Sequence, residues 1–106
     1  MHDQTKATAI SRKDRAIIHE RDGRQCINCR RPDRIELAHY IRRSQGGLGI
    51  PENVVSLCKK CHEAYDSAKT KVLKEYHQSR IKRHLDKHYP GFSDEDRVYK
   101  NKNEPW

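Results

Sequence analysis

The first part of the chain with a regular hydrophobic pattern predicts a helix over residues 11–21. Its apolar side consists of Ala16–Ile18, among charged neighbours. Ser11 stands three residues before Asp14, a spacing typical of a helix N-terminus at which a side-chain oxygen accepts a bond from a free backbone N–H. Gly23 follows shortly, and glycine tolerates the left-handed conformation with which many helices end. We therefore expect a capped helix that ends before Gly23.

Two short segments in the middle of the chain have the pattern of β-strands. Isoleucine and leucine occur at alternate positions over residues 35–41, and residues 54–57 are short and β-branched. The loop between them, residues 42–53, contains three glycines and a proline. We expect the two strands to pair as a hairpin across this long loop.

The second half of the chain has a helical pattern. One helix is expected over residues 58–64 or beyond, and a longer one over residues 67–88, ended by Pro90-Gly91. The residues that recur there at intervals of three and four are Leu73, His77, Ile81, Leu85 and His88. Residues 1–10 and 92–106 are polar and have no such pattern, which predicts a loose N-terminal arm and a polar C-terminal tail.

The composition allows one small domain with little core of its own. The chain has 106 residues, of which 33% are hydrophobic and 36% charged, so little apolar area offsets the entropy of the chain. No apolar run is long enough to span a bilayer and no secretory signal is recognisable, so we expect a protein of the reducing cytoplasm. The formal net charge of +8 favours a polyanionic partner, with nucleic acid first and an anionic membrane surface second.

Four cysteines supply what the small core lacks. They form two Cys-x-x-Cys pairs, Cys26–Cys29 and Cys58–Cys61. A tight turn lets each pair of thiolates approach one ion, and four sulfurs satisfy a tetrahedral zinc ion, which contributes on the order of 10 kcal/mol to folding. The alternatives are two disulfides or a redox-active pair, which the missing secretory signal and the missing thioredoxin-like pattern disfavour. Zinc held by Cys26, Cys29, Cys58 and Cys61 would have no open coordination position, so its role would be structural.

Polar residues with a fixed order lie among these cysteine pairs. The segments that matter are Arg21–Cys26, Glu36–Ile41, Arg43–Gly47, Asn53 and Leu57–His62. Over about residues 20–66 the chain resembles the HNH endonucleases of the phage and bacterial type, the ββα-metal nucleases. The resemblance implies an α+β fold, a small zinc-stabilised ββα-metal (HNH) domain with flanking helices. The whole chain, 1–106, would be one domain, with a core over residues 11–66 and a basic helix and tail over residues 67–106.

The resemblance also implies a reaction, the metal-dependent hydrolysis of phosphodiester bonds in DNA by nicking or double-strand cleavage. His39 matches the general base that activates water, and an imidazole suits that task near neutral pH. His62 matches a ligand of the catalytic divalent ion (magnesium, manganese or another), which stabilises developing charge and the leaving 3′ oxygen. Asn53 matches the residue that holds the loop together and keeps the base in place. The products would have a 5′ phosphate and a 3′ hydroxyl.

The second protein ligand of the catalytic ion has to be sought elsewhere in the sequence. Ala38 stands where most members of the family have Asp or His, and alanine cannot coordinate a metal. Asp66 lies four residues after His62, hence on the same face of a helix, and is our candidate, with Glu36 as a weaker one. Each residue also has a plainer interpretation: His39 as a core histidine, His62 as an idle neighbour of zinc, and Asp66 as a helix cap or solvated charge.

Basic residues provide candidates for contact with DNA. Arg42 and Arg43 in the loop are expected to bind phosphates, while the cations of Lys69–Arg83 fit a DNA contact and a solvated helix face equally well. By analogy, the chain would act in the cytoplasm of a bacterium or a phage-infected host, with phage packaging or processing proteins as further partners and no membrane. The competing functions are a non-catalytic zinc-ribbon DNA-binding module, with Ala38 as the mark of lost catalysis, and a zinc-dependent protein adaptor.

Overall fold

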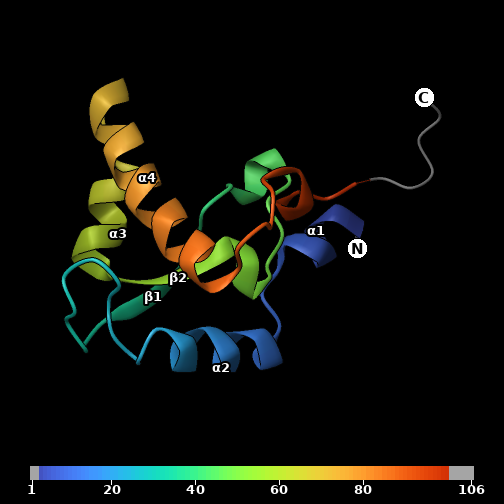
Figure 1. Ribbon diagram of the computed structural model, residues 1–106, viewed down its shortest axis with the longest axis horizontal. Coiled ribbons are helices and arrows are strands. Elements are labelled where there is room, and N and C mark those ends of the chain that lie inside the picture. The colour runs from blue at the N-terminus through green and yellow to red at the C-terminus, as the bar shows by residue number, and fades with distance from the viewer. Residues whose placement is uncertain (1–2, 101–106) are drawn as a thin grey trace.

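The computed structural model describes residues 3–100 (Figure 1). Helices and 3₁₀ turns surround a single hairpin, so the fold is α+β as expected. None of the helices within residues 3–100 has both the length and the apolar character needed to cross a membrane. The elements in chain order are α1 (Asp3–Thr8), α2 (Arg12–Arg21), β1 (Ile35–His39), η1 (Arg43–Gln45), η2 (Pro51–Asn53), β2 (Val54–Cys58), α3 (Lys59–Asp66), α4 (Lys71–His88) and η3 (Glu95–Arg97).

The hairpin is the centre of the fold, and its prediction is confirmed. β1 and β2 pair antiparallel, with Ile35 opposite Cys58 and His39 opposite Val54. In Figure 1, α2 lies below the hairpin, α3 lies above its left end, and α4 runs from the upper left down towards it. The buried core that these elements share contains Cys26, Ala38, Val55, Leu57, Cys58, Tyr65, Ile81 and Leu85.

The predicted capped helix is confirmed as α2. The Ser11 hydroxyl accepts a hydrogen bond of 3.0 Å from the backbone N–H of Asp14. The helix ends at Arg21, and Gly23 follows with a φ of 71°, in the left-handed region that favours glycine. Only part of the expected apolar side is used, because Ile18 is fully buried whereas Ile17 is 42% exposed.

The long basic helix begins later than its pattern predicts. Ser67 ends α3, where its hydroxyl donates to the carbonyl of Glu63 over 2.7 Å, and Thr70 caps α4 by accepting from the N–H of Leu73 over 3.1 Å. These short hydroxyl side chains bond to backbone groups and so interrupt the helical pattern. Ile81 and Leu85 are buried, but the first turns of α4 leave three apolar side chains exposed, those of Val72, Leu73 and Tyr76.

The N-terminal segment differs from the loose arm expected over residues 1–10. Residues 3–8 form α1, and Thr8 is only 3% exposed. The N–H of Gly49 donates to the carbonyl of Ala7 over 3.1 Å, and a Cβ on Gly49 would clash with the carbonyl of Ala9. The segment is held by close backbone contact with the loop rather than by apolar side chains. No hydrophobic pattern in the sequence therefore predicts its docking. Residues 1–2 lie outside the described part.

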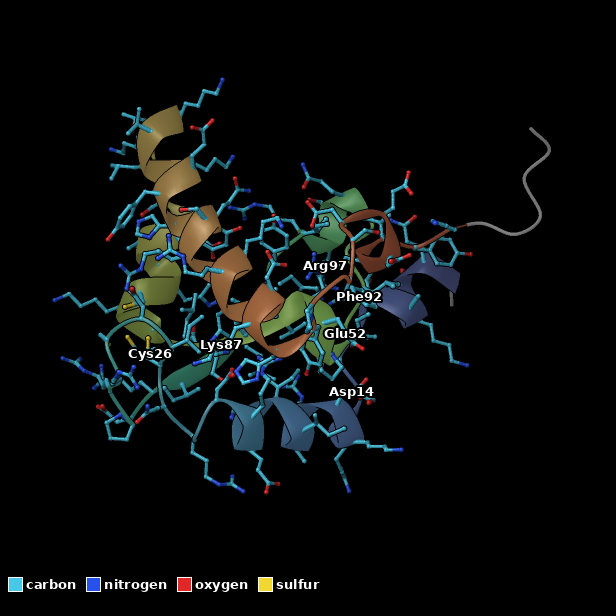
Figure 2. All side chains as sticks on the ribbon, viewed as in Figure 1. Asp14, Cys26, Glu52, Lys87, Phe92 and Arg97 are labelled. Carbon is cyan, nitrogen blue, oxygen red and sulfur yellow. The ribbon has the colours of Figure 1, made fainter. Side chains whose placement is uncertain are left out.

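The C-terminal tail is docked as far as residue 100 by a buried arginine (Figure 2). Arg97 is fully buried; its Nε donates to the carbonyl of Glu52 and its Nη1 to Asp94, each over 2.7 Å. Its guanidinium lies over the rings of Tyr40 and Phe92, 5.5 Å and 5.4 Å from their centroids. The Arg97 carbonyl accepts from the loop as well, so both terminal segments fix residues 42–53. Residues 101–106 lie outside the described part.

A buried carboxylate joins α2, β2 and α4. Asp22 receives two bonds from Arg21 (2.7 and 2.9 Å), one from the Ser56 N–H (2.9 Å), and faces the Nε2 of His84 at 2.7 Å. Burial opposes ionisation of this carboxyl, but the bonds from His84, Arg21 and Ser56 outweigh burial and hold the pKa of Asp22 well below its usual range. The network therefore depends on a charged Asp22.

We predict that Asp22→Asn lowers the free energy of unfolding by about 3 kcal/mol at pH 7, because it leaves the buried guanidinium of Arg21 without its counter-charge. Because the pKa of Asp22 in the fold is lower than its ordinary value near 3.8, the charged carboxylate stabilises the fold above that pH. This stabilisation is lost as the pH falls towards the lowered pKa. The difference in the free energy of unfolding between variant and parent, measured by urea titration, should therefore become smaller below about pH 4. Asp33→Asn, an exposed carboxylate in a 3.8 Å pair, is the control and should change stability by less than about 0.5 kcal/mol. A difference in the free energy of unfolding that does not change with pH would contradict the prediction.

Candidate functional site

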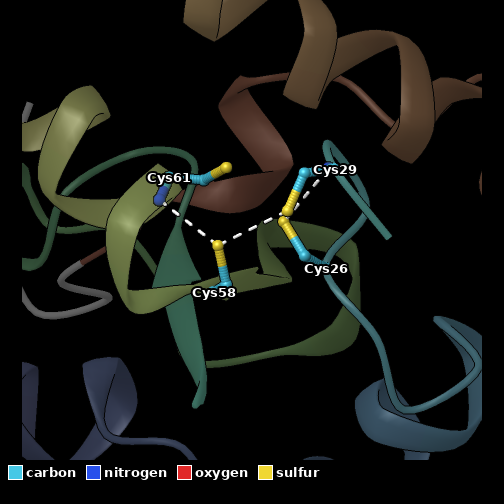
Figure 3. A group of neighbouring side chains, drawn as sticks. All are labelled: Cys26, Cys29, Cys58 and Cys61. Carbon is cyan, nitrogen blue, oxygen red and sulfur yellow. Dashed lines mark hydrogen bonds between the residues drawn. The ribbon is translucent and has the colours of Figure 1, made fainter. Parts of the chain in front are cut away.

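Two segments distant in sequence bring the four cysteines together (Figure 3). Cys26 and Cys29 lie in the turn after α2, Cys58 is the last residue of β2, and Cys61 is in the first turn of α3. Their sulfur atoms all lie within 4.8 Å of one another, and those of Cys29 and Cys58 are 3.6 Å apart. All four are free thiols, so the structure does not pair them as disulfides.

The cluster fits a tetrahedral metal ion. Zinc–sulfur bonds of about 2.3 Å place the sulfurs of a tetrahedral site about 3.8 Å apart, close to the separation observed here. Backbone N–H groups of Asn28 and Cys29 point at the Cys26 sulfur (3.4 and 3.5 Å), and the N–H of Cys61 points at the Cys58 sulfur (3.4 Å). Such N–H donors favour thiolates over thiols. The four sulfurs could therefore hold zinc.

Without a cation, the thiols compete for negative charge. Burial opposes ionisation at Cys26, yet bonds from the N–H groups of neighbouring residues lower the pKa of this thiol to about 7. Burial and the adjacent thiols of Cys58 and Cys26 raise the pKa of Cys61 to about 12. All four sulfurs can be thiolates only if a cation neutralises them, which is the condition of a structural metal site.

His39, at the end of β1, is oriented by a residue from outside the hairpin. Its Nε2 lies 2.9 Å from the carbonyl oxygen of Thr8 at the end of α1. A carbonyl only accepts, so Nε2 has the proton and Nδ1 has a free lone pair. Burial lowers the pKa of His39, and the charges of Arg43 and His62 add to this effect, while the bond to Thr8 opposes it. His39 is therefore neutral near pH 7 and able to accept a proton.

Asn53 holds together the two ends of the loop. It is fully buried, and its Nδ2 donates to the carbonyls of Ile41 (3.1 Å) and Leu48 (2.8 Å). Its Oδ1 accepts from the N–H of Ile41 over 2.9 Å. The side chain thus takes the backbone of Ile41 out of the ladder, which explains why β1 ends at His39 rather than at residue 41 as the sequence pattern predicts.

The structure brings His62 together with both carboxylates considered as its partners. The Nδ1 of His62 lies 2.8 Å from Glu36, and its Nε2 lies 3.4 Å from Asp66. Asp66 also pairs with Arg42 over 3.3 Å. Within residues 3–100 these three side chains do not converge on one point as the cysteines do, because each carboxylate faces a different nitrogen of the imidazole.

The two loop arginines are engaged within the protein. Arg43 donates to the Thr8 hydroxyl (3.3 Å) and to the Thr5 carbonyl (3.5 Å), while Arg42 lies over the ring of Tyr65, 5.3 Å from its centroid. Thr8 therefore contacts both His39 and Arg43. Sequence analysis did not find this residue, and no side-chain pattern could have revealed it, since its main contact uses a backbone carbonyl.

A comparison with protein families identifies the segment that contains these residues. Residues 26–67 match the family described as HNH endonuclease. The chain contains an HNH domain. No curated protein and no solved structure matched the chain. The HNH domain spans the four cysteines, His39, Asn53 and His62, and implies a nuclease-type function on DNA; α1, α2 and α4 lie outside it.

We predict that the purified protein contains one equivalent of zinc, measured by elemental analysis. Cys61→Ser should lose most of the metal and lower the unfolding temperature, because metal binding supplies on the order of 10 kcal/mol of folding free energy. Asn28→Ala is the matched control: it removes only a 3.3 Å bond to the Cys61 sulfur from an exposed side chain. Full metal content and unchanged stability in Cys61→Ser would refute a four-cysteine site.

Proposed function

We propose that the chain is a metal-dependent endonuclease that hydrolyses phosphodiester bonds in DNA, with His39 as general base and His62 as a ligand of the catalytic ion. The observation that supports this most directly is the orientation of His39: one nitrogen is held by the Thr8 carbonyl and the other is free. The bond at Nε2 leaves the lone pair of Nδ1 available to accept a proton, as a general base requires. The HNH match over residues 26–67 supports DNA as the substrate.

The proposed proton transfer uses both nitrogens of His39. Nδ1 removes a proton from a water molecule as the water oxygen forms a bond to phosphorus. The imidazolium that results keeps its Nε2–H on the Thr8 carbonyl, which stabilises the positive charge. The bond from phosphorus to the 3′ oxygen breaks, and the leaving oxygen takes a proton from a second water molecule, so the products are a 3′ hydroxyl and a 5′ phosphate. The lowered pKa of His39 keeps the base in its active form near neutral pH.

The side chains around His62 fit the binding of a hard divalent ion. Glu36 at Nδ1 fixes the imidazole so that Nε2 is the ligand atom, as carboxylates beside metal-bound histidines do, and Asp66 on the Nε2 side is the proposed second ligand. With few protein ligands, such a site suits Mg²⁺ or Mn²⁺, which would stabilise charge on the phosphate and on the leaving oxygen. Arg42, which now pairs with Asp66, would be released to contact DNA.

One observation favours a second candidate, a DNA-binding module without catalysis. Ala38 is 1% exposed and belongs to the hydrophobic core, so the position before the proposed base offers no ligand and cannot be approached by an ion. If His62 and Asp66 hold an ion too weakly, the domain would bind DNA and leave it intact.

Incubation of supercoiled plasmid with the protein and Mg²⁺ or Mn²⁺ separates these candidates. We expect cleavage that His39→Ala reduces by about 10²-fold or more, because the general base is lost, while His19→Ala on α2 cuts like the parent. Activity should fall as the pH drops below the usual histidine value of 6.5, with the midpoint displaced downwards by the lowered pKa. A mobility shift without cleavage in any divalent ion would favour the binding module, and equal cleavage by His39→Ala would exclude this base.

The N-terminal segment should control the tautomer of His39. Gly49→Ala places a Cβ 2.7 Å from the Thr8 carbonyl oxygen and so displaces this carbonyl from the imidazole. We expect a lower kcat with little change in KM, together with loss of the pure Nε2–H pattern in ¹⁵N NMR of the histidine side chain. Gly91→Ala is the control: its φ of 85° costs the variant some stability, but nothing lies within 4 Å of the added Cβ, so kcat and the tautomer should both stay the same. If the Thr8 carbonyl is displaced in Gly49→Ala and His39 still has its proton on Nε2, the N-terminal segment does not control the tautomer.

A further inference from the structure

A group of basic side chains borders the cysteine cluster on the side where α3 begins. Arg31, Arg34, Lys59 and Lys60, here called the knuckle rim, line a surface pocket of about 260 Å³ together with Cys58 and Glu63. We propose that the knuckle rim binds the phosphates of the same DNA duplex whose scissile bond lies at His39. The inference rests on the proposed function for the identity of the ligand, and it adds a binding surface distinct from Arg42 and Arg43.

The charges of the knuckle rim are available to a ligand. All four side chains belong to exposed residues, and Glu63 is the only acidic residue of the pocket. The single ion pair of these cations within residues 3–100 is a 3.8 Å contact between Arg31 and Asp33, whose side chains are 51% and 65% exposed. The N-terminal end of α3, where the helix dipole favours negative charge, lies at the same place. A phosphate there would meet several cations without displacing a strong internal partner.

Two arginines beside the cysteine cluster have a backbone conformation that favours glycine. Arg34 has a φ of 54° and the nearby Arg30 a φ of 65°, both in the left-handed region. Glycine occupies this region freely, whereas a residue with a Cβ is strained there. Because neither side chain is buried, packing does not explain the choice. Arg24 has the same conformation outside the pocket, so the strain does not by itself assign a ligand, but it makes glycine a replacement that removes the charge of Arg34 without straining the backbone.

The knuckle rim and the proposed catalytic residues are connected through α3 and β1. Lys59 stands three residues before His62, on the same helix face, and its N–H donates to the carbonyl of Arg34 over 2.9 Å. Arg34 directly precedes β1, which ends at His39, so the strand separates them by roughly 15 Å. Each strand of a duplex has a phosphate about every 3.4 Å along its axis, so one duplex reaches both places.

A structural explanation of the same cations makes the opposite prediction for stability. Four thiolates with one zinc ion have a net charge of −2, and the knuckle rim could serve only to neutralise it. Removal of an arginine would then destabilise the protein and weaken metal retention. If the arginine is kept for DNA, its replacement by glycine relieves backbone strain, so the unfolding temperature stays the same or rises while DNA affinity falls.

The experiment compares Arg34→Gly with Arg24→Gly in the metal-loaded full chain. Arg24 is also exposed and left-handed, with a φ of 56°, but does not line the pocket, so the two variants lose equal charge and equal strain. Both are made with His39→Ala, so that a fluorescent 20-base-pair duplex remains intact while binding is measured by anisotropy over a series of KCl concentrations. Unfolding temperature and zinc content are measured on the same samples.

We expect Arg34→Gly to bind the duplex several-fold more weakly, with the slope of log affinity against log salt reduced by about 1, at unchanged or higher unfolding temperature. Arg24→Gly should bind with nearly the parent affinity. Equal losses in both variants, or a fall in unfolding temperature and zinc content in Arg34→Gly alone, would overturn the proposal. If DNA binding depends on the knuckle rim but the protein never cuts plasmid, the proposed nuclease function is refuted while the knuckle rim is supported as a DNA-binding surface.

Discussion

The cysteine cluster is the constraint on which the rest of the structure depends. It joins the turn after α2 to the junction of β2 and α3, and so fixes the helix that contains His62 against the strand that ends at His39. A chain with 33% hydrophobic residues has few other means to hold that relation. Since Cys58 and Cys61 belong to the same short segment as His62, the position of His62 depends on the geometry of the cysteine cluster.

The loop over residues 42–53 depends on a different principle, backbone hydrogen bonding. Asn53 closes it from inside, α1 contacts it through the Ala7 carbonyl, and the C-terminal segment contacts it through the Arg97 carbonyl. None of these contacts is apolar. The loop therefore owes its shape to polar groups that are paired within the loop and with both terminal segments. This makes the shape specific, because a lost partner leaves an unsatisfied group.

The parts of this structure that sequence could predict are those determined by local pattern. The cap of α2, the hairpin and the clustering of the cysteines follow from neighbours or from metal chemistry, and the spacing of four residues between His62 and Asp66 correctly placed them together. The contact of Glu36 with His62 depends on how α3 packs on β1, so spacing alone could rank it only second. The docking of α1 could not be predicted, because it uses backbone carbonyls, which every residue has. The burial of Arg97 could not be predicted either, because a hydrophobic pattern assigns only apolar residues to the interior.

The docking of α1 also changes what should count as the working unit of this protein. The family match begins at Cys26, yet the oxygen that orients His39 belongs to Thr8, eighteen positions earlier in the chain. A fragment cut at the family boundaries would keep the four cysteines, His39, Asn53 and His62 and still lack the carbonyl oxygen that orients the imidazole. Transplanting the HNH segment into another protein would require the host to provide an equivalent carbonyl at the end of the first strand.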